Sequence, residues 1–253
     1  MAQNFILYSD GGAELRVSGA GACILEEEDT GRRLYLAVNL GGATNNEAEI
    51  FAGLLGFAYI RSQDKNFSGS IRWVCDSEYV LKSATQYINN WKRNGWQTAA
   101  KKPVKNQGLW QAYSELSSGI KVTADHVRGH TGHPENEACD AMTNWVRANE
   151  DMLPEGGSGV QVEFEGEDWT VFNLKSALKE FRRSDEVNLE TITELIEVCG
   201  GAQGAKPAGK KKGNDSAAVK RAKSMLESAA KELAGAESPA AIKLRSEIKQ
   251  LLK

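Results

Sequence analysis

The sequence is poor in cysteine, and the few cysteines that it has lie far apart. It contains no Cys-x-x-Cys pair, which argues against a zinc site and a disulfide framework, so we expect reduced thiols. The chain also has no run of about 18 apolar residues, and no basic segment leads into an apolar stretch at its N-terminus. We therefore expect a soluble, cytoplasmic protein with no membrane partner. The cysteines are Cys23, Cys75, Cys139 and Cys199.

The whole chain has no large excess of positive or negative charge, but two of its segments do. The formal net charge is −3 over 253 residues. Residues 1–150 carry 15 basic and 17 acidic side chains, residues 151–205 carry 4 and 12, and residues 206–253 carry 12 and 5. A basic tail after an acidic segment is typical of a nucleic-acid-binding arm, although a solvated helix can have the same composition. With 41% hydrophobic residues, the chain is otherwise an ordinary globular sequence that can bury a core.

Hydrophobic periodicity places strands and helices in alternation over the first 150 residues. Short apolar runs bounded by turns predict strands, and apolar residues at helical spacing predict helices. Three strands come first and the later elements alternate, which indicates an α/β fold with a five-stranded mixed sheet flanked by helices. The predicted strands are 5–10, 19–25, 33–40, 70–76 and 120–127, and the predicted helices are 46–60, 77–91, 106–117 and 135–149.

Carboxylates occupy the ends or inner faces of several of these elements. Asp10 ends an apolar strand, where an unpaired buried charge is unfavourable unless a cation binds it. Asp10 can instead begin a tight turn, and Glu49 can form a capping box with Asn46. Asp76 can cap a helix, and Asp140 can form a surface ion pair. Each structural alternative can explain one carboxylate, but together they explain all four less well, because four carboxylates would have to occupy such positions by chance.

Four segments carry a family resemblance. They are Tyr-Ser-Asp-Gly-Gly at 8–12, Thr-Asn-Asn-Glu-Ala-Glu at 44–49, Asp-Ser-Glu-Tyr-Val at 76–80 and the run from Gly129 to Asp140 that begins Gly-His-Thr-Gly-His-Pro. In order and spacing they resemble the motif set of type 1 ribonuclease H, which suggests a catalytic domain at 1–152. The resemblance implies an endonuclease that hydrolyses the RNA strand of RNA–DNA hybrids and leaves 3′-hydroxyl and 5′-phosphate ends. It also implies two Mg²⁺ ions, with Mn²⁺ as a substitute, held by Asp10, Glu49, Asp76 and Asp140.

The expected chemistry suits this set of ligands. Two cations about 4 Å apart can stabilise both the attacking and the leaving oxygen of a phosphodiester, and hard oxygen ligands suit magnesium. His130 lies between Gly129 and Gly132 and can carry protons to or from the reacting oxygens; an ordinary exposed loop histidine is the alternative. By resemblance, Glu137 orients a water of the metal site. A hybrid-binding module with secondary catalysis is the rival function.

Residues 91–106 combine cations and tryptophans without an acid. Cations neutralise phosphates and aromatic faces contact sugars or bases, so the stretch favours nucleic-acid binding over a solvated loop. It is similar to the basic protrusion that some ribonucleases H use to grip the DNA strand. Integrases and transposases share the fold and its carboxylates, and both this protrusion and the His130 loop favour ribonuclease H over them. The candidate residues are Trp91, Lys92, Arg93, Trp96, Lys101, Lys102 and Lys105.

Selection of RNA requires groups that read 2′-hydroxyls. The candidates are Asn45, Asn46 and the backbone of Gly11 and Gly12, with Thr44 as part of a phosphate pocket. Many members of the family have an Asn-Pro-Gly turn after the first aspartate, whereas residues 14–19 read Glu-Leu-Arg-Val-Ser-Gly. The phosphate contact of that turn is therefore not carried over.

The resemblance stops near residue 150. Residues 154–159 have the composition of a linker, 160–166 alternate like a strand, and 169–183 and 189–198 have helical spacing. We expect a small acidic α+β module at 160–199, a flexible basic linker at 200–214 and a helical hairpin at 215–253. The hairpin can dock on a protein partner or bind further nucleic acid. We expect the protein to be a monomer.

Overall fold

A seven-stranded mixed sheet forms the centre of the computed structural model, which describes residues 3–129, 132–154, 159–183 and 188–201. The described residues all belong to one compact unit. The strand order across the sheet is β5-β4-β1-β2-β3-β7-β6. The strands are β1 (Asn4–Glu14), β2 (Ser18–Glu27), β3 (Arg32–Asn39), β4 (Ser70–Cys75), β5 (Lys121–His126), β6 (Val160–Phe164) and β7 (Glu167–Asn173).

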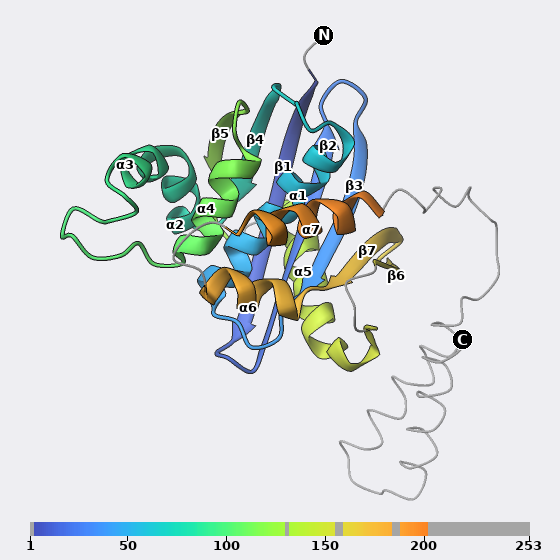
Figure 1. The fold of residues 1–253 in the computed structure, drawn as a ribbon. Coiled ribbons are helices and arrows are strands. Elements are labelled where there is room, and N and C mark those ends of the chain that lie inside the picture. Colours follow the sequence, from blue (N-terminus) through green and yellow to red (C-terminus); the bar gives the residue numbers. More distant parts are fainter. Residues whose placement is uncertain (1–2, 130–131, 155–158, 184–187, 202–253) are drawn as a thin grey trace, which may run out of the picture. The chain divides into compact units, whose positions relative to one another are not determined.

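The directions of the strands bring several chain segments to one edge of the sheet. β1 is parallel to β4, β4 is parallel to β5, and β3 is parallel to β7. β2 is antiparallel to both β1 and β3, so β1 and β3 also run in the same direction. The carboxyl ends of β1, β3, β4, β5 and β7 therefore share one edge, the lower edge of the sheet in Figure 1.

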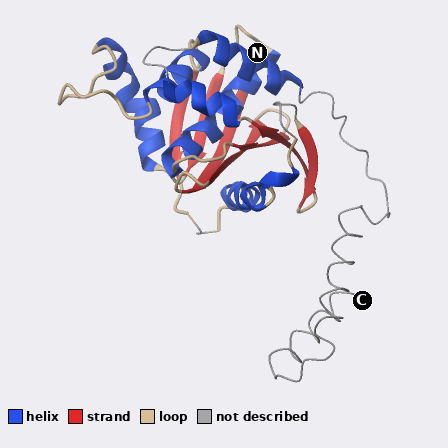
Figure 2. Cartoon of the chain, turned by 60° about the horizontal axis from the view of Figure 1, so that its bottom comes forward, coloured by secondary structure: helices blue, strands red, loops and turns tan. Residues whose placement is uncertain are grey.

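Helices cover both faces of this sheet (Figure 2). One face packs against α5, and the other packs against α1, α4, α6 and α7. α2 continues through the π-helical turn η1 into α3, so the predicted helix 77–91 is confirmed with one irregular turn. The helices are α1 (Asn45–Gln63), α2 (Glu78–Lys82), η1 (Ser83–Tyr87), α3 (Ile88–Arg93), α4 (Gln107–Leu116), α5 (Pro134–Ala148), η2 (Glu150–Met152), α6 (Lys175–Arg183) and α7 (Leu189–Gly200).

Two hydrophobic cores result from the alternation of side chains along β1. Leu7 points to the α1 face, whereas Ile6 and Tyr8 point to the α5 face. Trp73 of β4 is fully buried on the α1 side, and its indole Nε1 donates a 2.8 Å hydrogen bond to the buried Ser9 hydroxyl. The central strands are thus buried on both faces, as the apolar run at the start of the sequence predicted.

Residues 160–201 extend the sheet, and this corrects two predictions. β7 pairs with β3, so the sheet has seven strands where the sequence predicted five, and residues 160–199 are not a separate module. Residues 169–173 form a strand, not the start of a helix; the predicted helix is found only at α6. Trp169 and Val171 pack on the α5 side while Phe172 packs on the α1 side. A strand buried on both faces lacks the alternation that distinguishes it from a helix.

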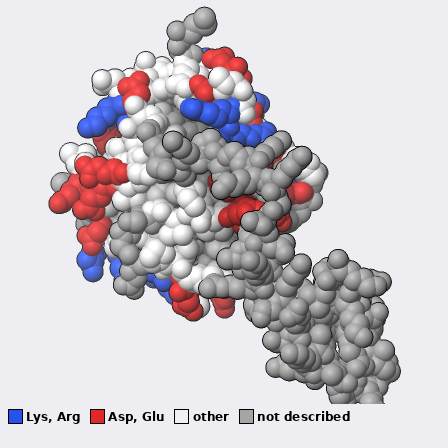
Figure 3. Space-filling view, turned by 90° about the vertical axis from the view of Figure 1, so that its right-hand side faces the viewer, with Lys and Arg blue, Asp and Glu red and all other residues white. Residues whose placement is uncertain are grey.

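The β6–β7 hairpin carries much of the acidic charge of this segment. Exposed carboxylates of Glu163, Glu165, Glu167 and Asp168 project from it. Acidic side chains are prominent on the face shown in Figure 3, which is the right-hand side of Figure 1. Charges on an edge strand discourage pairing with another chain. Of these four residues, Glu163 lies on the edge strand β6 itself.

The linker and hairpin expected at 200–214 and 215–253 lie outside the described residues, apart from Gly200 and Gly201. All four cysteine thiols are free and buried. Among the described helices, none has the length and apolar character needed to span a membrane.

Candidate active site

Asp10 lies at the carboxyl-end edge of the sheet, in β1, which continues to Glu14. Strand β1 can pass close to α1 here because residue 11 is glycine. A Cβ on Gly11 would lie 2.3 Å from the backbone nitrogen of Glu49. The strand that carries one carboxylate is thus held directly against the helix that carries the next.

Glu49 lies in the first turns of α1, and the structure shows that it does not form a capping box with Asn46. The N-cap of α1 is Thr44, and Glu47, not Glu49, completes the capping box. The backbone nitrogen of Thr44 donates a 2.8 Å hydrogen bond to Glu47. The carboxylate of Glu49 instead accepts a hydrogen bond from the hydroxyl of Ser77. Burial raises the pKa of Glu49, against the effect of the Ser77 hydrogen bond.

Asp76 follows β4 directly, and it is not a helix cap either. Ser77 is the N-cap of α2 and accepts from the backbone nitrogen of Val80 at 3.4 Å. The backbone carbonyl of Asp76 lies 3.0 Å from Nε2 of His126, at the end of β5. A Cβ on Gly129 would lie 2.6 Å from the Asp76 carboxylate. The segment after β5 therefore reaches this carboxylate.

Asp140 lies on α5, on the opposite face of the sheet from α1. The Asn144 side-chain amide donates a 3.1 Å hydrogen bond to it, and the described residues include no ion pair of Asp140. Thr143 donates a 3.3 Å hydrogen bond to the backbone oxygen of Asp10. This contact fixes α5 against β1 and brings the fourth carboxylate to the same edge.

The four carboxylates act on one another electrostatically. Burial, followed by the charges of Asp76, Asp140 and Glu49, raises the pKa of Asp10 from 3.8 to about 7. An unbalanced negative cluster of this kind favours binding of a cation. Among the described residues, however, no three carboxylate, histidine or cysteine side chains are grouped closely enough to hold a metal ion as they stand. Glu49 and Asp140 are instead hydrogen-bonded to Ser77 and Asn144.

The loop after β5 is fixed at both of its described ends. Gly129 lies against Asp76, and the backbone nitrogen of Gly132 donates a 2.8 Å hydrogen bond to Glu137. Glu137, expected to orient a water, thus binds the backbone of Gly132 in the structure. His130 lies outside the described residues.

The candidates for reading hydroxyls lie at the start of α1 and in β1. The side-chain oxygen of Asn45 accepts a 2.8 Å hydrogen bond from the backbone nitrogen of Ala13, and Asn45 is exposed. Asn46 is exposed. The Thr44 hydroxyl donates a 2.8 Å hydrogen bond to Glu47. A Cβ on Gly12 would make only ordinary contacts, so unlike Gly11 it is not required by packing.

The altered turn after β1 packs on the segment before α1. Arg16 has a positive φ of 58°, and its backbone nitrogen donates a 2.9 Å hydrogen bond to the carbonyl of Ala43. A Cβ on Gly42 would lie 2.5 Å from the carbonyl oxygen of Arg16. This close contact requires glycine at position 42.

The basic stretch 91–106 projects from the body of the protein beyond α3 (Figure 1). Trp91 and Trp96 are half-buried and pack on the core, with the Trp91 ring 6.0 Å from that of Trp110. The loop closes through hydrogen bonds from Thr98 to the Lys102 carbonyl and from Val104 to the Trp96 carbonyl, at 2.8 and 3.0 Å. The tryptophans thus anchor the loop, while its cations are exposed, namely Lys92, Arg93, Lys101, Lys102 and Lys105.

Three residues that the sequence did not single out contact the residues of the site. Ser77 and Asn144 hold Glu49 and Asp140, and Arg182 binds Glu47 at the start of α1. Asn144 is four residues after Asp140, a spacing that places both on one helix face, so this contact could have been predicted from the local sequence. Arg182 is 135 residues from Glu47 in the sequence, and no local pattern predicts their contact.

Comparison with known proteins agrees with this geometry. The ribonuclease H of Pseudomonas paraeruginosa is 37% identical over 146 residues, which are 56% of this chain and 92% of that protein. The ribonuclease H of Hydrogenovibrio crunogenus is 38% identical over 148 residues, 56% of this chain and 94% of that protein. The crystal structure of LC9-RNase H1, described as a type 1 RNase H with the type 2 active-site motif, aligns with a TM-score of 0.51 and 21% identity. That alignment covers 59% of this chain and 74% of the other, and it shows a likeness of fold alone. The RNase H family model matches residues 2–147, and this chain therefore belongs to the ribonuclease H family of enzymes.

Proposed function

We propose that the protein is an endonuclease that hydrolyses the RNA strand of RNA–DNA hybrids and leaves 3′-hydroxyl and 5′-phosphate ends. The proposal rests on the convergence of Asp10, Glu49, Asp76 and Asp140. Gly11 of β1 packs directly against the backbone of Glu49, and Thr143 of α5 donates a hydrogen bond to the backbone oxygen of Asp10. Burial, together with the charges of the other three carboxylates, raises the pKa of Asp10 to about 7. The candidate hydroxyl-reading residues lie on two of the same elements, Gly11 and Gly12 in β1 and Asn45 and Asn46 at the start of α1. Membership of the ribonuclease H family supports the same activity.

The four carboxylates fit two Mg²⁺ ions in their chemistry, because hard divalent cations prefer oxygen ligands. We propose that all four serve as ligands and that Mn²⁺ can replace Mg²⁺. When bound, such a pair of cations would lower the pKa of an attacking water and stabilise the leaving oxygen. Ser77 and Asn144 hold Glu49 and Asp140 until a cation competes for them.

The other groups of the chain bind and orient the substrate. The amides of Asn45 and Asn46 and the backbone of Gly11 and Gly12 face the 2′-hydroxyls, and the exposed cations of the protrusion bind the DNA strand through its phosphates. Glu137 accepts a hydrogen bond from the backbone nitrogen of Gly132, two residues after His130. We propose that His130 moves a proton at the reacting oxygens.

Cleavage of an end-labelled RNA–DNA hybrid, with and without EDTA, tests the proposal. The intact protein should cut only the RNA strand, only with a divalent cation, and should leave matched DNA and RNA duplexes intact. Asp10→Asn and Asp76→Asn should abolish cleavage and retain hybrid binding. Binding without cleavage in the intact protein would support the rival function, a hybrid-binding module, and substantial activity in either variant would overturn the assignment of the carboxylates.

A further inference from the structure

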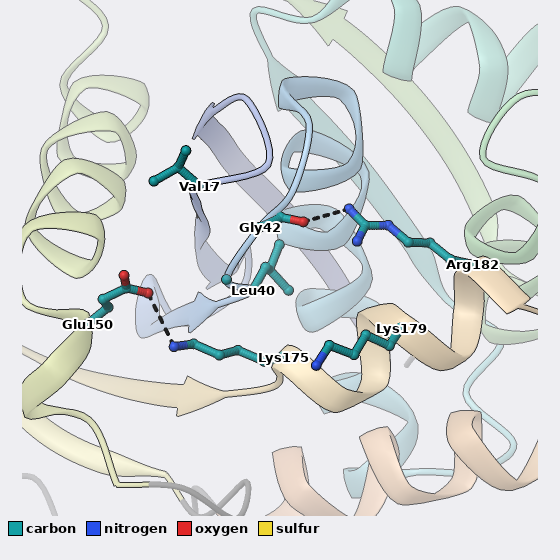
Figure 4. Close-up of a pocket in the computed structure, with 8 residues that line it drawn as sticks. Val17, Leu40, Gly42, Glu150, Lys175, Lys179 and Arg182 are labelled. Atoms are coloured by element: carbon teal, nitrogen blue, oxygen red, sulfur yellow. Dashed lines mark hydrogen bonds and ion pairs between the residues drawn. The ribbon is translucent and has the colours of Figure 1, made fainter.

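A pocket of about 200 Å³ lies between α6 and the segment that leads into α1 (Figure 4). Leu40 and Gly42 line it on the side of the segment before α1, and the basic side chains of α6 line it from the other side. Residues 160–201, which build one wall, lie beyond the part of the chain that matches the family. The lining residues are Val17, Leu40, Gly41, Gly42, Glu150, Lys175, Lys179 and Arg182.

The distribution of charge in α6 is unusual for its surroundings. Residues 151–205 carry 12 acidic and 4 basic side chains, and all four basic ones lie between 175 and 183. Lys175, Lys179 and Arg182 follow helical spacing on one face and line the pocket. Leu178 and Phe181, on the neighbouring face, are buried in the core. The helix thus presents its cations to the pocket while its apolar face fixes it in place.

Only part of this positive charge is neutralised. Arg182 is bound by Glu47, and its NH2 group also donates a 2.8 Å hydrogen bond to the Gly42 carbonyl. Lys175 lies 3.2 Å from Glu150. Lys179 is exposed and, within the described part of the chain, forms no ion pair. The pocket therefore has a net positive charge and one ammonium group ready for an anion.

The pocket opens at the edge of the sheet that carries the catalytic carboxylates. Gly41 and Gly42 lead directly into Thr44, the cap of α1, and Val17 belongs to the turn between β1 and β2. α6 begins after the carboxyl end of β7, which shares this edge with the ends of β1 and β4. A nucleic-acid strand that contacts Asn45 and Asn46 would continue past this pocket.

We propose that the pocket binds a backbone phosphate of the hybrid substrate, with Lys179 as the main contact and Lys175 shared with Glu150. This proposal rests on the proposed function, because the ligand is the same hybrid. A hybrid held at the carboxylates presents its phosphates to the pocket at high effective concentration. A free phosphate ion has no such tether. Arg182 is held by Glu47 and forms the wall of the pocket.

Binding of a short RNA–DNA hybrid to the full-length chain, in EDTA and over a range of KCl concentrations, tests the proposal. Lys179→Ala should weaken binding severalfold and reduce the slope of log affinity against log salt by about 0.7 to 0.9, because one phosphate contact is lost. Lys121→Ala is the matched control, since Lys121 is an exposed lysine at the start of β5, away from this edge. Cleavage with Mg²⁺ should show a raised KM and an unchanged kcat for Lys179→Ala.

Two outcomes would overturn the proposal. Equal slopes for Lys179→Ala and the parent, with cleavage intact, would show that the lysine does not contact the backbone. The second outcome comes from an experiment with inorganic phosphate, in which chloride keeps the ionic strength of the control the same. If phosphate protects Lys179 from acetylation at low millimolar concentration while Lys179→Ala leaves hybrid affinity unchanged, the pocket is a site for a free anion. A parent protein that binds hybrid through Lys179 but does not cut it would refute the proposed function and leave the pocket standing.

Discussion

Arg182 in α6 donates two hydrogen bonds of 2.7 Å to the carboxylate of Glu47 in α1. Glu47 also completes the capping box of α1, two residues before the catalytic candidate Glu49. The side chain of Glu47 is only 9% exposed. The C-terminal extension therefore helps to hold the first turn of the helix that carries one of the four carboxylates.

Arg182→Ala should lower the free energy of unfolding by about 2 to 3 kcal/mol, because hydrogen bonds to a charged group are lost and a buried carboxylate is left without its partner. Burial raises the pKa of Glu47, but the hydrogen bonds from Arg182 and Thr44 outweigh it, so its folded pKa is lowered. The stability from this pair is present above the unfolded pKa of about 4.3 and is lost as pH falls through the folded value. Urea unfolding at several pH values measures the effect.

The control for this prediction is Arg183→Ala, which removes a neighbouring arginine whose partner, Glu180, lies on the same helix. Its effect should stay within about 0.5 kcal/mol, as for most surface substitutions. The difference between Arg182→Ala and the parent should shrink below pH 4. A difference of the same size at pH 3 and pH 7 would contradict the role of the Glu47 charge.

A chain that ends at residue 153 should not fold stably. Phe172, Leu178 and Phe181 belong to the same buried core as Phe51 of α1, and the Phe51 and Phe181 rings lie 6.0 Å apart. Removing them exposes this apolar surface and leaves β3 as an unpaired edge. Solubility and near-ultraviolet circular dichroism would report the loss. A chain that ends at Gly201 keeps every described contact and should melt like the full-length protein; a stable, active 1–153 fragment would contradict this prediction.

The central sheet could be predicted because its residues give local signals. The apolar run before Asp10, the strand ending at Cys75 and the helical spacing of α1 were all readable, and the structure confirms them. β7 could not be identified, since Trp169 to Phe172 are buried on both faces and show no alternation. Its pairing with β3 joins segments more than 130 residues apart, and no local pattern encodes such a contact.

For the candidate site, too, some features could be predicted from the sequence and others could not. The four carboxylates were identified by motif, and in the structure the charges of Asp76, Asp140 and Glu49 act with burial to raise the pKa of Asp10. The caps offered as structural alternatives, at Asn46 and Asp76, lie one or two residues away from the true N-caps, Thr44 and Ser77. Capping depends on where the backbone leaves the helical conformation, and neighbouring Thr, Asn, Ser and Asp residues suit it about equally well. The Arg182 contact required the folded structure.

Asp10→Asn should stabilise the protein in EDTA at pH 8, by about 1 kcal/mol or more, although it should abolish cleavage. The folded pKa of Asp10 is raised to about 7 by burial and by its acidic neighbours, above its unfolded value. A raised carboxyl pKa destabilises the fold at pH values above the unfolded pKa, and the cost is complete above pH 7. The gain in melting temperature should therefore be present at pH 8 and absent near pH 4. Equal melting temperatures at pH 8 would show that neither burial nor the neighbouring carboxylates destabilise the charged form of Asp10.

His130→Ala should slow turnover by about 10²- to 10⁴-fold, the usual contribution of a general acid or base. The apparent magnesium affinity, taken from the dependence of rate on Mg²⁺, should stay nearly unchanged, because the histidine is not a ligand. His133→Ala is a matched control, since His133 is the N-cap residue of α5 and its ring packs on Tyr8. A His130→Ala variant with the parental rate would make this residue an ordinary loop histidine.

Replacing Lys101, Lys102 and Lys105 with alanine should weaken hybrid binding and flatten its salt dependence, with little change in the rate at saturating hybrid. All three are exposed in the loop that Trp91 and Trp96 anchor, so their removal leaves the packing of the loop intact. Each lost phosphate contact should reduce the slope of log affinity against log salt by about 0.7 to 0.9.

Trp96→Ala provides the contrasting variant for this loop. The backbone carbonyl of Trp96 accepts from Val104, and its half-buried ring packs on the core, so the substitution should release the loop without removing a charge. Affinity should then fall because the cations are no longer held in place, while the salt slope of the contacts that remain changes less than in the triple variant. Fluorescence anisotropy with a labelled hybrid, over a range of KCl concentrations, separates the two effects. A triple variant with the slope of the parent would show that the lysines do not contact phosphate, because loss of a charge contact cannot leave counterion release unchanged.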